Sequence, residues 1–285
     1  MIHGDQIMLI RALLLSGISL LSGCQQPGMD FDFDKALSIA QKAQQANKTI
    51  AEPEEISMGN GIAANLLGAS PLLADDRVQQ YVNQVGRWVS LHTERPDLPW
   101  QFGILASTDV NAFATPGGTI FLTRGLLQKL NNESELAGVL AHEMVHVLRK
   151  HHLAALQKEA RLGVASDLLG EALKDKNNPV LEKAIKAGTE VYARGLDKND
   201  EFEADRMGIV IATRAGYDPF GLPAVLQMLE ASNAQDSSLA LMFKTHPAPR
   251  DRLNLLDKLM GNRFEAYTAP TQTDKRFNSE VSQHL

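Results

Sequence analysis

Two histidines, His142 and His146, stand one helical turn apart, and a glutamate, Glu143, directly follows the first of them. In a helix, residues at i and i+4 share one face, so both imidazoles can reach a single point in space. Two imidazole nitrogens at this spacing suit zinc, and Glu143 can lean over the metal and hold a water molecule. The H-E-x-x-H pattern is therefore typical of zinc-dependent peptide hydrolysis. Two satisfied histidines in a buried helix are the alternative.

A catalytic zinc needs a third protein ligand and one open position. The segment NDEFEADRMGIVIATRAG supplies Glu201, with Asp205 one turn further along the same helix face. We expect Glu201 to be the third ligand and Asp205 to accept the free ring N–H of a ligating histidine. Gly208 and Ala212 on this face, and Gly138 on the zinc helix, would let the two helices approach closely. A solvated acidic helix start is the alternative for both carboxylates.

Both segments must be helical to position these groups. Asn132, with Glu135 three residues later, predicts an N-cap for the zinc helix, which is expected to run to about His151. Asn199 or Asp200 is expected to cap the second helix.

The remaining pattern indicates more helix and a little sheet. Residues 75–92 repeat apolar side chains at helical spacing and should lay one face on the core: Val78, Tyr81, Val82, Val85, Trp88 and Val89. WQFGILAS and GTIFLTRG are typical of short strands, and they flank TDVNAFATPGG, whose Pro-Gly-Gly predicts a turn. Nearly everything after residue 131 has helical character. The predicted fold class is mainly α with a small β-sheet (α+β).

The composition is that of an ordinary globular protein. The 285 residues are 44% hydrophobic and 22% charged, enough to bury one sizeable core. The formal net charge of -6 provides no basic surface, so no nucleic-acid partner is expected.

The N-terminus predicts export. Arg11 precedes an uncharged run from Ala12 to Gly23, which is too short to span a bilayer but suits a signal peptide. LSGC, ending at Cys24, resembles the bacterial lipobox, in which the cysteine is lipidated and becomes the new N-terminus. The next residue is Gln25 and not Asp, which favours the outer membrane. A small apolar cysteine buried in a core helix is the alternative.

The H-E-x-x-H motif followed by EFEAD resembles the zinc protease family that contains the CAAX prenyl protease, the HtpX-type membrane protease and the mitochondrial Oma-type protease. NAFATPGGTIFLTRGLL, AHEMVH and THPAPRDR also match in the family's order, and the similarity covers about residues 55–260. The resemblance implies a zincin-like fold, one zinc held by His142, His146 and Glu201, Glu143 as catalytic base, and polypeptide substrates. The family's soluble branch includes the periplasmic lipoprotein LoiP and the outer-membrane assembly protease BepA. The sequence shows neither the hydrophobic spans of the integral-membrane members nor a tetratricopeptide array after the protease, so it most resembles the short lipoprotein type.

The resemblance also implies a substrate strand, in which an extended peptide pairs with an edge strand. The residues expected to bind it are Asn111, Ala112, Phe113 and Ala114. His246 is expected either to stabilise the tetrahedral oxyanion as a catalytic residue or to occupy the open zinc position in a latent state. A loop histidine fixed by Pro247 is the alternative.

Five further side chains receive weaker expectations. Arg250 should support the loop of His246, and Tyr192 and Tyr217 are candidate transition-state donors. His151 and His152 are expected only to complement the negative end of the helix dipole.

Four parts are predicted along the chain: a signal peptide (1–23), a lipidated cysteine with its tether (24–51), a zinc metalloprotease domain (52–262) and a loose C-terminal tail (263–285). The predicted function is a zinc-dependent endopeptidase, lipid-anchored to the bacterial outer membrane and facing the periplasm, that acts on misfolded or outer-membrane proteins. Two alternatives stay open: a chaperone or assembly scaffold with latent proteolysis, and a zinc hydrolase of non-peptide substrates.

Overall fold

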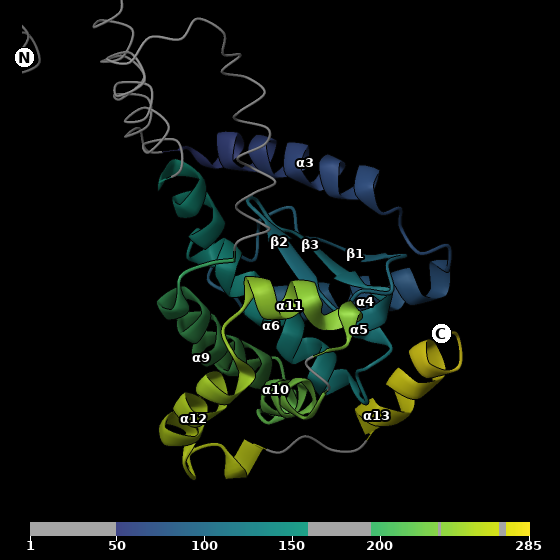
Figure 1. Ribbon diagram of the computed structural model, residues 1–285, viewed down its shortest axis with the longest axis vertical. Helices are drawn as coiled ribbons and strands as arrows, with labels where there is room; N and C mark the ends of the chain where they lie inside the picture. The colour runs from purple at the N-terminus through teal and green to yellow at the C-terminus, as the bar shows by residue number, and fades with distance from the viewer. Residues whose placement is uncertain (1–49, 159–194, 233–234, 268–271) are drawn as a thin grey trace, which may run out of the picture. The chain divides into compact units, whose positions relative to one another are not determined.

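The computed structural model describes residues 50–158, 195–232, 235–267 and 272–285, without the side chains of 272–274 (Figure 1). Cys24, with the expected signal peptide and most of the tether, lies outside these residues, as does Tyr192. In the described ranges, no helix is both long enough and apolar enough to span a bilayer.

A three-stranded mixed sheet lies next to the helices. Its strands are β1 (Gln101–Leu105), β2 (Ala112–Thr115) and β3 (Thr119–Thr123), in the order β1-β3-β2. β3 pairs with β1 in parallel and with β2 antiparallel. Gly117 and Gly118 make the β2–β3 turn at φ values of 83° and 108°, which only glycine adopts without steric cost. Both predicted strands and the turn are confirmed, and β2 lies at one edge of the three described strands.

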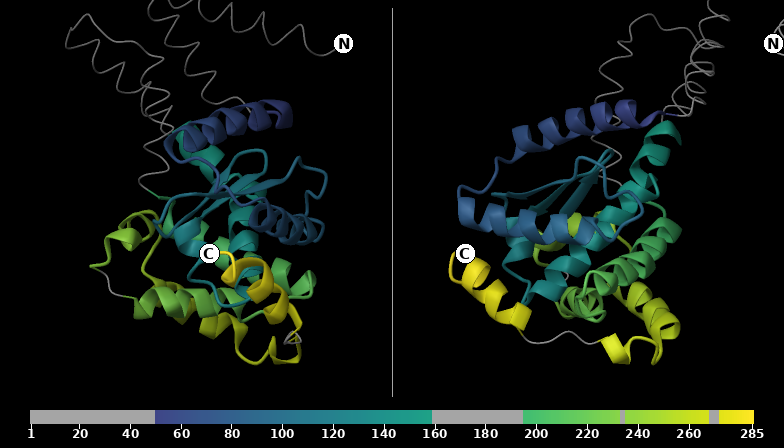
Figure 2. Two further views of the ribbon diagram at one scale, coloured as in Figure 1. Left: turned by 90° about the vertical axis from the view of Figure 1, so that its right-hand side faces the viewer. Right: turned by 180° about the vertical axis from the view of Figure 1, so that it is seen from behind.

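Helices cover both faces of the sheet (Figures 1 and 2). α3 (Glu52–Ala69), with Pro53 in its first turn, contacts β2 and β3 on one face, while α4 (Asp76–Ser90) and α6 (Glu133–Leu148) pack on the other. The other helices are α5 (Arg124–Leu127), α9 (Lys198–Arg214), α10 (Gly221–Ala231), α11 (Ala240–Thr245), α12 (Pro249–Met260) and α13 (Gln272–Phe277). Other described elements are short turns of 3-10 helix at Ser237–Leu239 and Glu265–Tyr267, a π-helical turn at Asn278–Ser282 and a helical run at 151–158. The predicted α+β class is confirmed.

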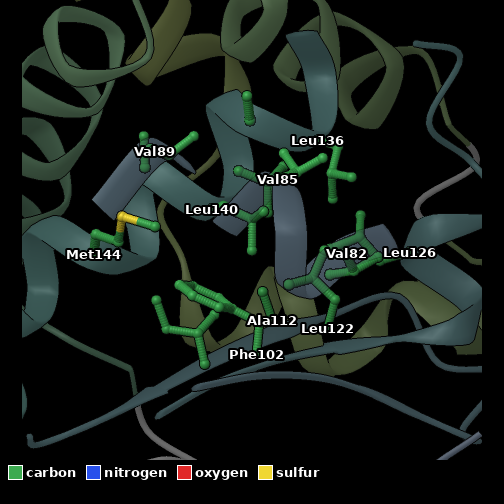
Figure 3. Close-up of a cluster of buried hydrophobic side chains, with 14 of the residues drawn as sticks. Val82, Val85, Val89, Phe102, Ala112, Leu122, Leu126, Leu136, Leu140 and Met144 are labelled. Carbon is green, nitrogen blue, oxygen red and sulfur yellow. The ribbon is translucent and has the colours of Figure 1, made fainter. Parts of the chain in front are cut away.

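The main core fills the space between α4, α6 and the sheet. Figure 3 shows α4 and α6 presenting apolar side chains toward the strands, among them Val82, Val85, Leu140 and Met144, while Phe102 of β1 points back at them. Trp88 departs from the prediction, because 49% of it stays exposed while its indole N–H donates to the Ala215 carbonyl.

α6 is buried along its whole length, from Glu133 to Leu148. Asn132 caps it as predicted, since its side chain accepts the Glu135 N–H at 2.9 Å. The predicted end at His151 is wrong. The helix ends at Leu148, and Lys150 adopts a left-handed φ of 58° before a new helical run covers 151–158.

The predicted cap of α9 is also wrong. The helix begins at Lys198 and is preceded by Asp197, whose side chain makes no capping hydrogen bond, so Asn199 and Asp200 lie inside the first turn.

The C-terminal segment differs from the predicted loose tail. Phe277 and Val281, four residues apart, are fully buried in the main core, and Phe277 packs edge-on against Tyr81. Arg276 forms an ion pair with the buried Glu133 at the start of α6. These two apolar anchors and one charge pair hold a segment whose overall composition is polar.

Candidate metal centre

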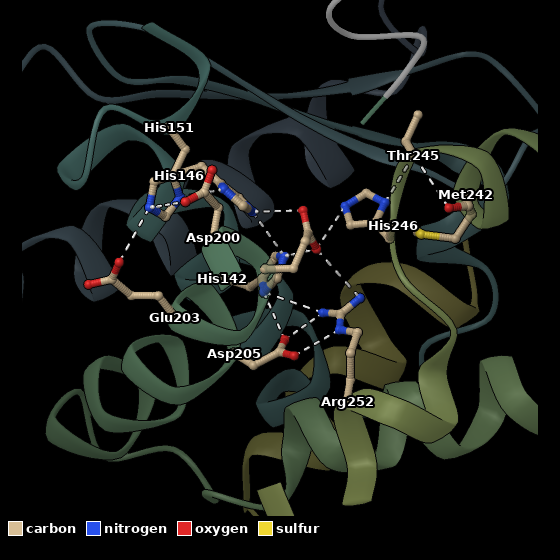
Figure 4. Close-up of polar contacts among 11 residues, drawn as sticks. His142, His146, His151, Asp200, Glu203, Asp205, Met242, Thr245, His246 and Arg252 are labelled. Atoms are coloured by element: carbon tan, nitrogen blue, oxygen red, sulfur yellow. Dashed lines mark hydrogen bonds and ion pairs between the residues drawn. The ribbon is translucent and has the colours of Figure 1, made fainter. Parts of the chain in front are cut away.

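His142, His146 and Glu201 converge between α6 and α9. The Nε2 atoms of the two histidines lie 3.2 Å apart, and each lies 3.6 Å from an oxygen of Glu201. The three side chains are 4%, 1% and 1% exposed, and one ligand atom from each lies within 4.8 Å of the others. Figure 4 shows both imidazoles turned toward the same point. The structure therefore brings together the three residues that the sequence proposes as ligands.

A glycine permits this convergence. A Cβ on Gly208 of α9 would lie 3.0 Å from the backbone nitrogen of His142 and 3.1 Å from its Cα, so a larger residue would push α9 away from α6. The close approach expected at Gly208 is confirmed. Gly138 serves a different neighbour, because its added Cβ would meet Leu222 of α10 at 2.8 Å.

The donor set fits a zinc ion. Two imidazole nitrogens and one carboxylate are the ligands of many catalytic zinc sites, which leave a fourth position open. Among the described residues, the buried Oε2 of Glu201 has no hydrogen-bond partner. A buried carboxylate oxygen without a donor is costly, and a divalent cation at this point would satisfy it.

Asp205 and Arg252 support His142 from the side away from the other ligands. Asp205 Oδ1 lies 3.0 Å from His142 Nδ1, and the Asp205 carboxylate accepts bidentate hydrogen bonds from the Arg252 guanidinium at 2.8 and 2.5 Å. Burial would raise the pKa of Asp205, but the Arg252 charge outweighs it and holds that pKa well below its usual range. Burial would likewise lower the pKa of His142, yet Asp205 and Glu201 raise it to about 9. His142 is therefore a strongly basic ligand.

Arg252 is the residue that sequence reasoning missed. The expected supporting arginine, Arg250, is exposed and pairs with Glu230 instead. Arg252 is 4% exposed because it lies on the buried face of α12, one turn before Leu256. That i, i+4 spacing is the signal that would have distinguished the two arginines.

Glu143 lies beside the ligands with a buried carboxylate. Burial, supported by the negative charge of Glu201, raises its pKa to about 7, although the positive charge of His142 opposes this. A carboxylate with a pKa near neutrality can both accept and return a proton at physiological pH.

His246 faces the ligands from the end of α11. Its Nε2 lies 3.9 Å from Glu201 Oε2, and its Nδ1 lies 3.0 Å from Thr245 Oγ1. The Thr245 hydroxyl donates to the Leu241 carbonyl at 2.9 Å, so it can only accept from His246 Nδ1–H. Burial lowers the pKa of His246, which favours the neutral ring. In this network Nε2 carries a lone pair toward the metal position.

A pocket of about 340 Å³ opens beside the centre. Asn111, Ala112 and Phe113 line it, whereas Ala114 is fully buried and does not. Asn111 Nδ2 is buried without a hydrogen-bond partner in the described part of the chain, while its Oδ1 accepts the Ala112 N–H. The other lining residues are Glu143, His146, His152, Gly195, Leu196, Glu201, Thr245 and His246.

Three side chains do not behave as expected. The Tyr217 hydroxyl donates to Glu133 at 2.9 Å and does not line the pocket, so its expected role as a transition-state donor is wrong. His151 does not merely complement a helix end, because its Nδ1 lies 3.0 Å from His146 Nδ1. His152 lines the pocket, and burial lowers its pKa to about 3.

The model of peptidase family M48 matches residues 76–260. The chain is 31% identical over 252 residues to the beta-barrel assembly-enhancing protease of Yersinia pestis, covering 86% of this chain and 51% of that protein. It is 31% identical over 226 residues to the protein of the same name from Escherichia coli, covering 77% and 46%. It is 26% identical over 178 residues to the mitochondrial metalloendopeptidase OMA1 of Schizosaccharomyces pombe, covering 62% and 52%. The chain spans about half the length of each of these relatives.

Proposed function

The chain belongs to peptidase family M48, and we propose that it is a zinc-dependent endopeptidase that cleaves polypeptides. One observation carries the proposal: His142, His146 and Glu201 meet with 3.2 and 3.6 Å between their ligand atoms, and the buried Glu143 lies beside them. This is the minimum set for metal-assisted peptide hydrolysis, with three ligands and one carboxylate that can transfer a proton.

Each of these residues has a defined role. His142, His146 and Glu201 would hold the zinc, and Asp205 fixes the ring of His142 through its 3.0 Å contact with Nδ1. A bound zinc ion supplies the Lewis acidity that polarises the scissile carbonyl and acidifies water. Glu143 accepts the proton of the attacking water and returns it to the departing amine, as its pKa of about 7 allows.

The substrate binds along β2. Asn111, which directly precedes this strand, lines the pocket together with Ala112 and Phe113 of the strand. The buried, unsatisfied Nδ2 of Asn111 would donate to a substrate carbonyl, which supports a role in holding the peptide near Glu143.

His246 would complete the ligand set in a resting state. Its Nε2 lone pair, fixed by the Thr245 contact at Nδ1, faces the ligands, and His246 lies within 4.8 Å of His142 and Glu143 by their ligand atoms. A neutral Nε2 without a hydrogen binds metal and cannot donate to an oxyanion, which favours the latent role over the donor role in this arrangement. His246→Ala should then raise the rate of cleavage of an unfolded protein. A lower rate with zinc still bound would favour the donor role.

The envelope of a bacterium is the proposed location, with outer-membrane proteins as substrates. The relatives named beta-barrel assembly-enhancing protease support this, and so does the segment LSGC, ending at Cys24, which resembles a lipobox. Cys24→Ala should release an active, soluble protein into the periplasm. Membrane retention of this variant would mean that the hydrophobic run is an uncleaved anchor.

The second candidate function is an assembly factor with latent proteolysis. The position of His246 over the ligands favours it, because such a site is blocked until it opens.

The deciding experiment compares the wild type with Glu143→Gln on unfolded casein and in cells. Cleavage should disappear while zinc binding remains, since Glu143 is not among the three ligands. If the wild type does not cleave, the peptidase proposal is overturned. Full biological function in the inactive variant would show that cleavage is not the function in cells and would favour the assembly factor. Substrates held by the variant in the periplasm would be identified by mass spectrometry.

A further inference from the structure

The second ring nitrogen of His146 has a partner that the proposed function does not use. With Nε2 turned to the metal position, Nδ1 of His146 lies 3.0 Å from Nδ1 of His151. The two rings pack edge to face with centroids 5.1 Å apart, and His151 is 6% exposed. A metal-binding histidine usually donates this N–H to a carboxylate or a carbonyl, as His142 does to Asp205. Here the acceptor is a second imidazole.

The ring hydrogens of His146 and His151 can be assigned by following the contacts outward from the metal position. A neutral His146 that presents its Nε2 lone pair to a metal carries its hydrogen on Nδ1. Nδ1 of His151 must then accept, so the hydrogen of His151 sits on Nε2. That Nε2 lies 3.5 Å from Glu203 Oε2 and 3.7 Å from Asp200 Oδ1. Both carboxylates favour a hydrogen on the nitrogen that faces them.

The backbone is built to bring His151 to this place. In an unbroken helix, a residue five positions on would point about 140° away from His146. The left-handed φ of 58° at Lys150 interrupts the helix, and the Lys150 ammonium is held by the buried Glu55 at 2.8 Å. Arg149, next to this break, contacts Glu203 Oε1 at 3.2 Å and so helps to place the carboxylate behind His151.

We propose that His151 is a positioning residue for the metal centre, fixing the tautomer and ring orientation of His146 through a chain that ends on Glu203 and Asp200. The two histidine ligands are thus held by different groups: His142 by a carboxylate locked to Arg252, and His146 by an imidazole backed by two carboxylates (Figure 4). This inference rests on the metal centre of the proposed function.

The test uses two variants of nearly equal polarity. In His151→Asn the side-chain oxygen can occupy the place of Nδ1 and still accept from His146, whereas the longer side chain in His151→Gln places its amide where Nε2 was. Zinc dissociation constants of the purified full chain are measured by competition with a chromophoric chelator. Loss of a group that orients a ligand typically costs about 10- to 100-fold in affinity. We expect that loss for His151→Gln and a change of less than about 3-fold for His151→Asn.

The absorption spectrum of the cobalt-substituted protein is the second readout. It should change for His151→Gln and match the wild type for His151→Asn, because it reports on the ligand geometry and not on stability. Melting temperatures of the metal-free proteins show whether either variant perturbs the fold. Equal zinc affinities for the two variants would overturn the proposal.

Two outcomes separate this inference from the proposed function. A wild type that binds no zinc would overturn both. If the wild type binds zinc and His151→Gln binds it with the same affinity, this inference alone is overturned. If His151→Gln does not fold, the double variant Asp200→Asn/Glu203→Gln decides, since both positions are about one-third exposed and tolerate change. Weakened zinc binding in that variant supports the chain of contacts, and unchanged binding refutes it.

Discussion

Arg252→Met should be one of the most destabilising single changes beside the metal centre. Arg252 and Asp205 are 4% and 1% exposed and are joined by two hydrogen bonds of 2.8 and 2.5 Å. Methionine keeps much of the apolar stem but leaves the buried Asp205 carboxylate without the guanidinium, which is its strongest positive partner. Removing one member of such a pair costs about 3–5 kcal/mol. A loss of this size lowers the folding equilibrium constant by roughly 10² to 10⁴. It is a large part of the stability of a typical domain, which is about 5–15 kcal/mol.

Urea unfolding of the metal-free chain measures this loss without the contribution of metal binding. Arg250→Met is the matched control, because Arg250 lies two residues away and its pair with Glu230 is exposed; its midpoint should not move. The double variant Arg252→Met/Asp205→Leu should recover about half of the loss or more, as it removes both buried charges. A single Arg252→Met variant within about 1 kcal/mol of the wild type would refute the assignment of Arg252 as the main charge partner of Asp205.

Three further predictions concern the ligands, the C-terminal segment and pH. Glu201→Ala should lose stoichiometric zinc by metal analysis, while Asp205→Ala should keep it with an affinity lower by about 10- to 100-fold; full occupancy without Glu201 would exclude it as a ligand. Phe277→Ala should lower the free energy of unfolding by about 3–5 kcal/mol, because the ring is fully buried in the core, and an unchanged urea midpoint would show that the segment is not anchored there. The pKa of Asp205 is lowered below 3.8 by folding, so its stabilisation is present above that pH and is lost as the pH falls through the folded pKa. The metal-free Asp205→Asn chain should therefore show a flatter loss of stability below about pH 4, and parallel acid curves would contradict this.

The sequence alone was informative wherever the evidence is local. The i, i+4 spacing of His142 and His146, the Asn132 cap and the small face of α9 are properties of single helices, and they hold whatever the helices pack against. The same is true of the turn at Gly117 and Gly118, which needs residues without a Cβ. The prediction of Glu201 as the third ligand joins two helices, and it rested on the need of a catalytic zinc for a third ligand and on the resemblance of EFEAD to the family's motif.

Tertiary structure decided the groups that surround the ligands. The i, i+4 spacing with Leu256 places Arg252, and not Arg250, on the apolar face of α12, but only the packing of the helices brings that face against α9 and Asp205. His151 reaches His146 only because Lys150 takes a left-handed φ beside Glu55, a residue almost one hundred positions earlier. The burial of Phe277 likewise cannot be predicted from the polar composition of the last residues, because it requires the space between α4 and α6. Periodicity along the chain determines which side chains share a face of a helix or strand. Which distant segment packs against that face depends on the tertiary fold, because burial and ion pairing need contacts between segments far apart in the sequence.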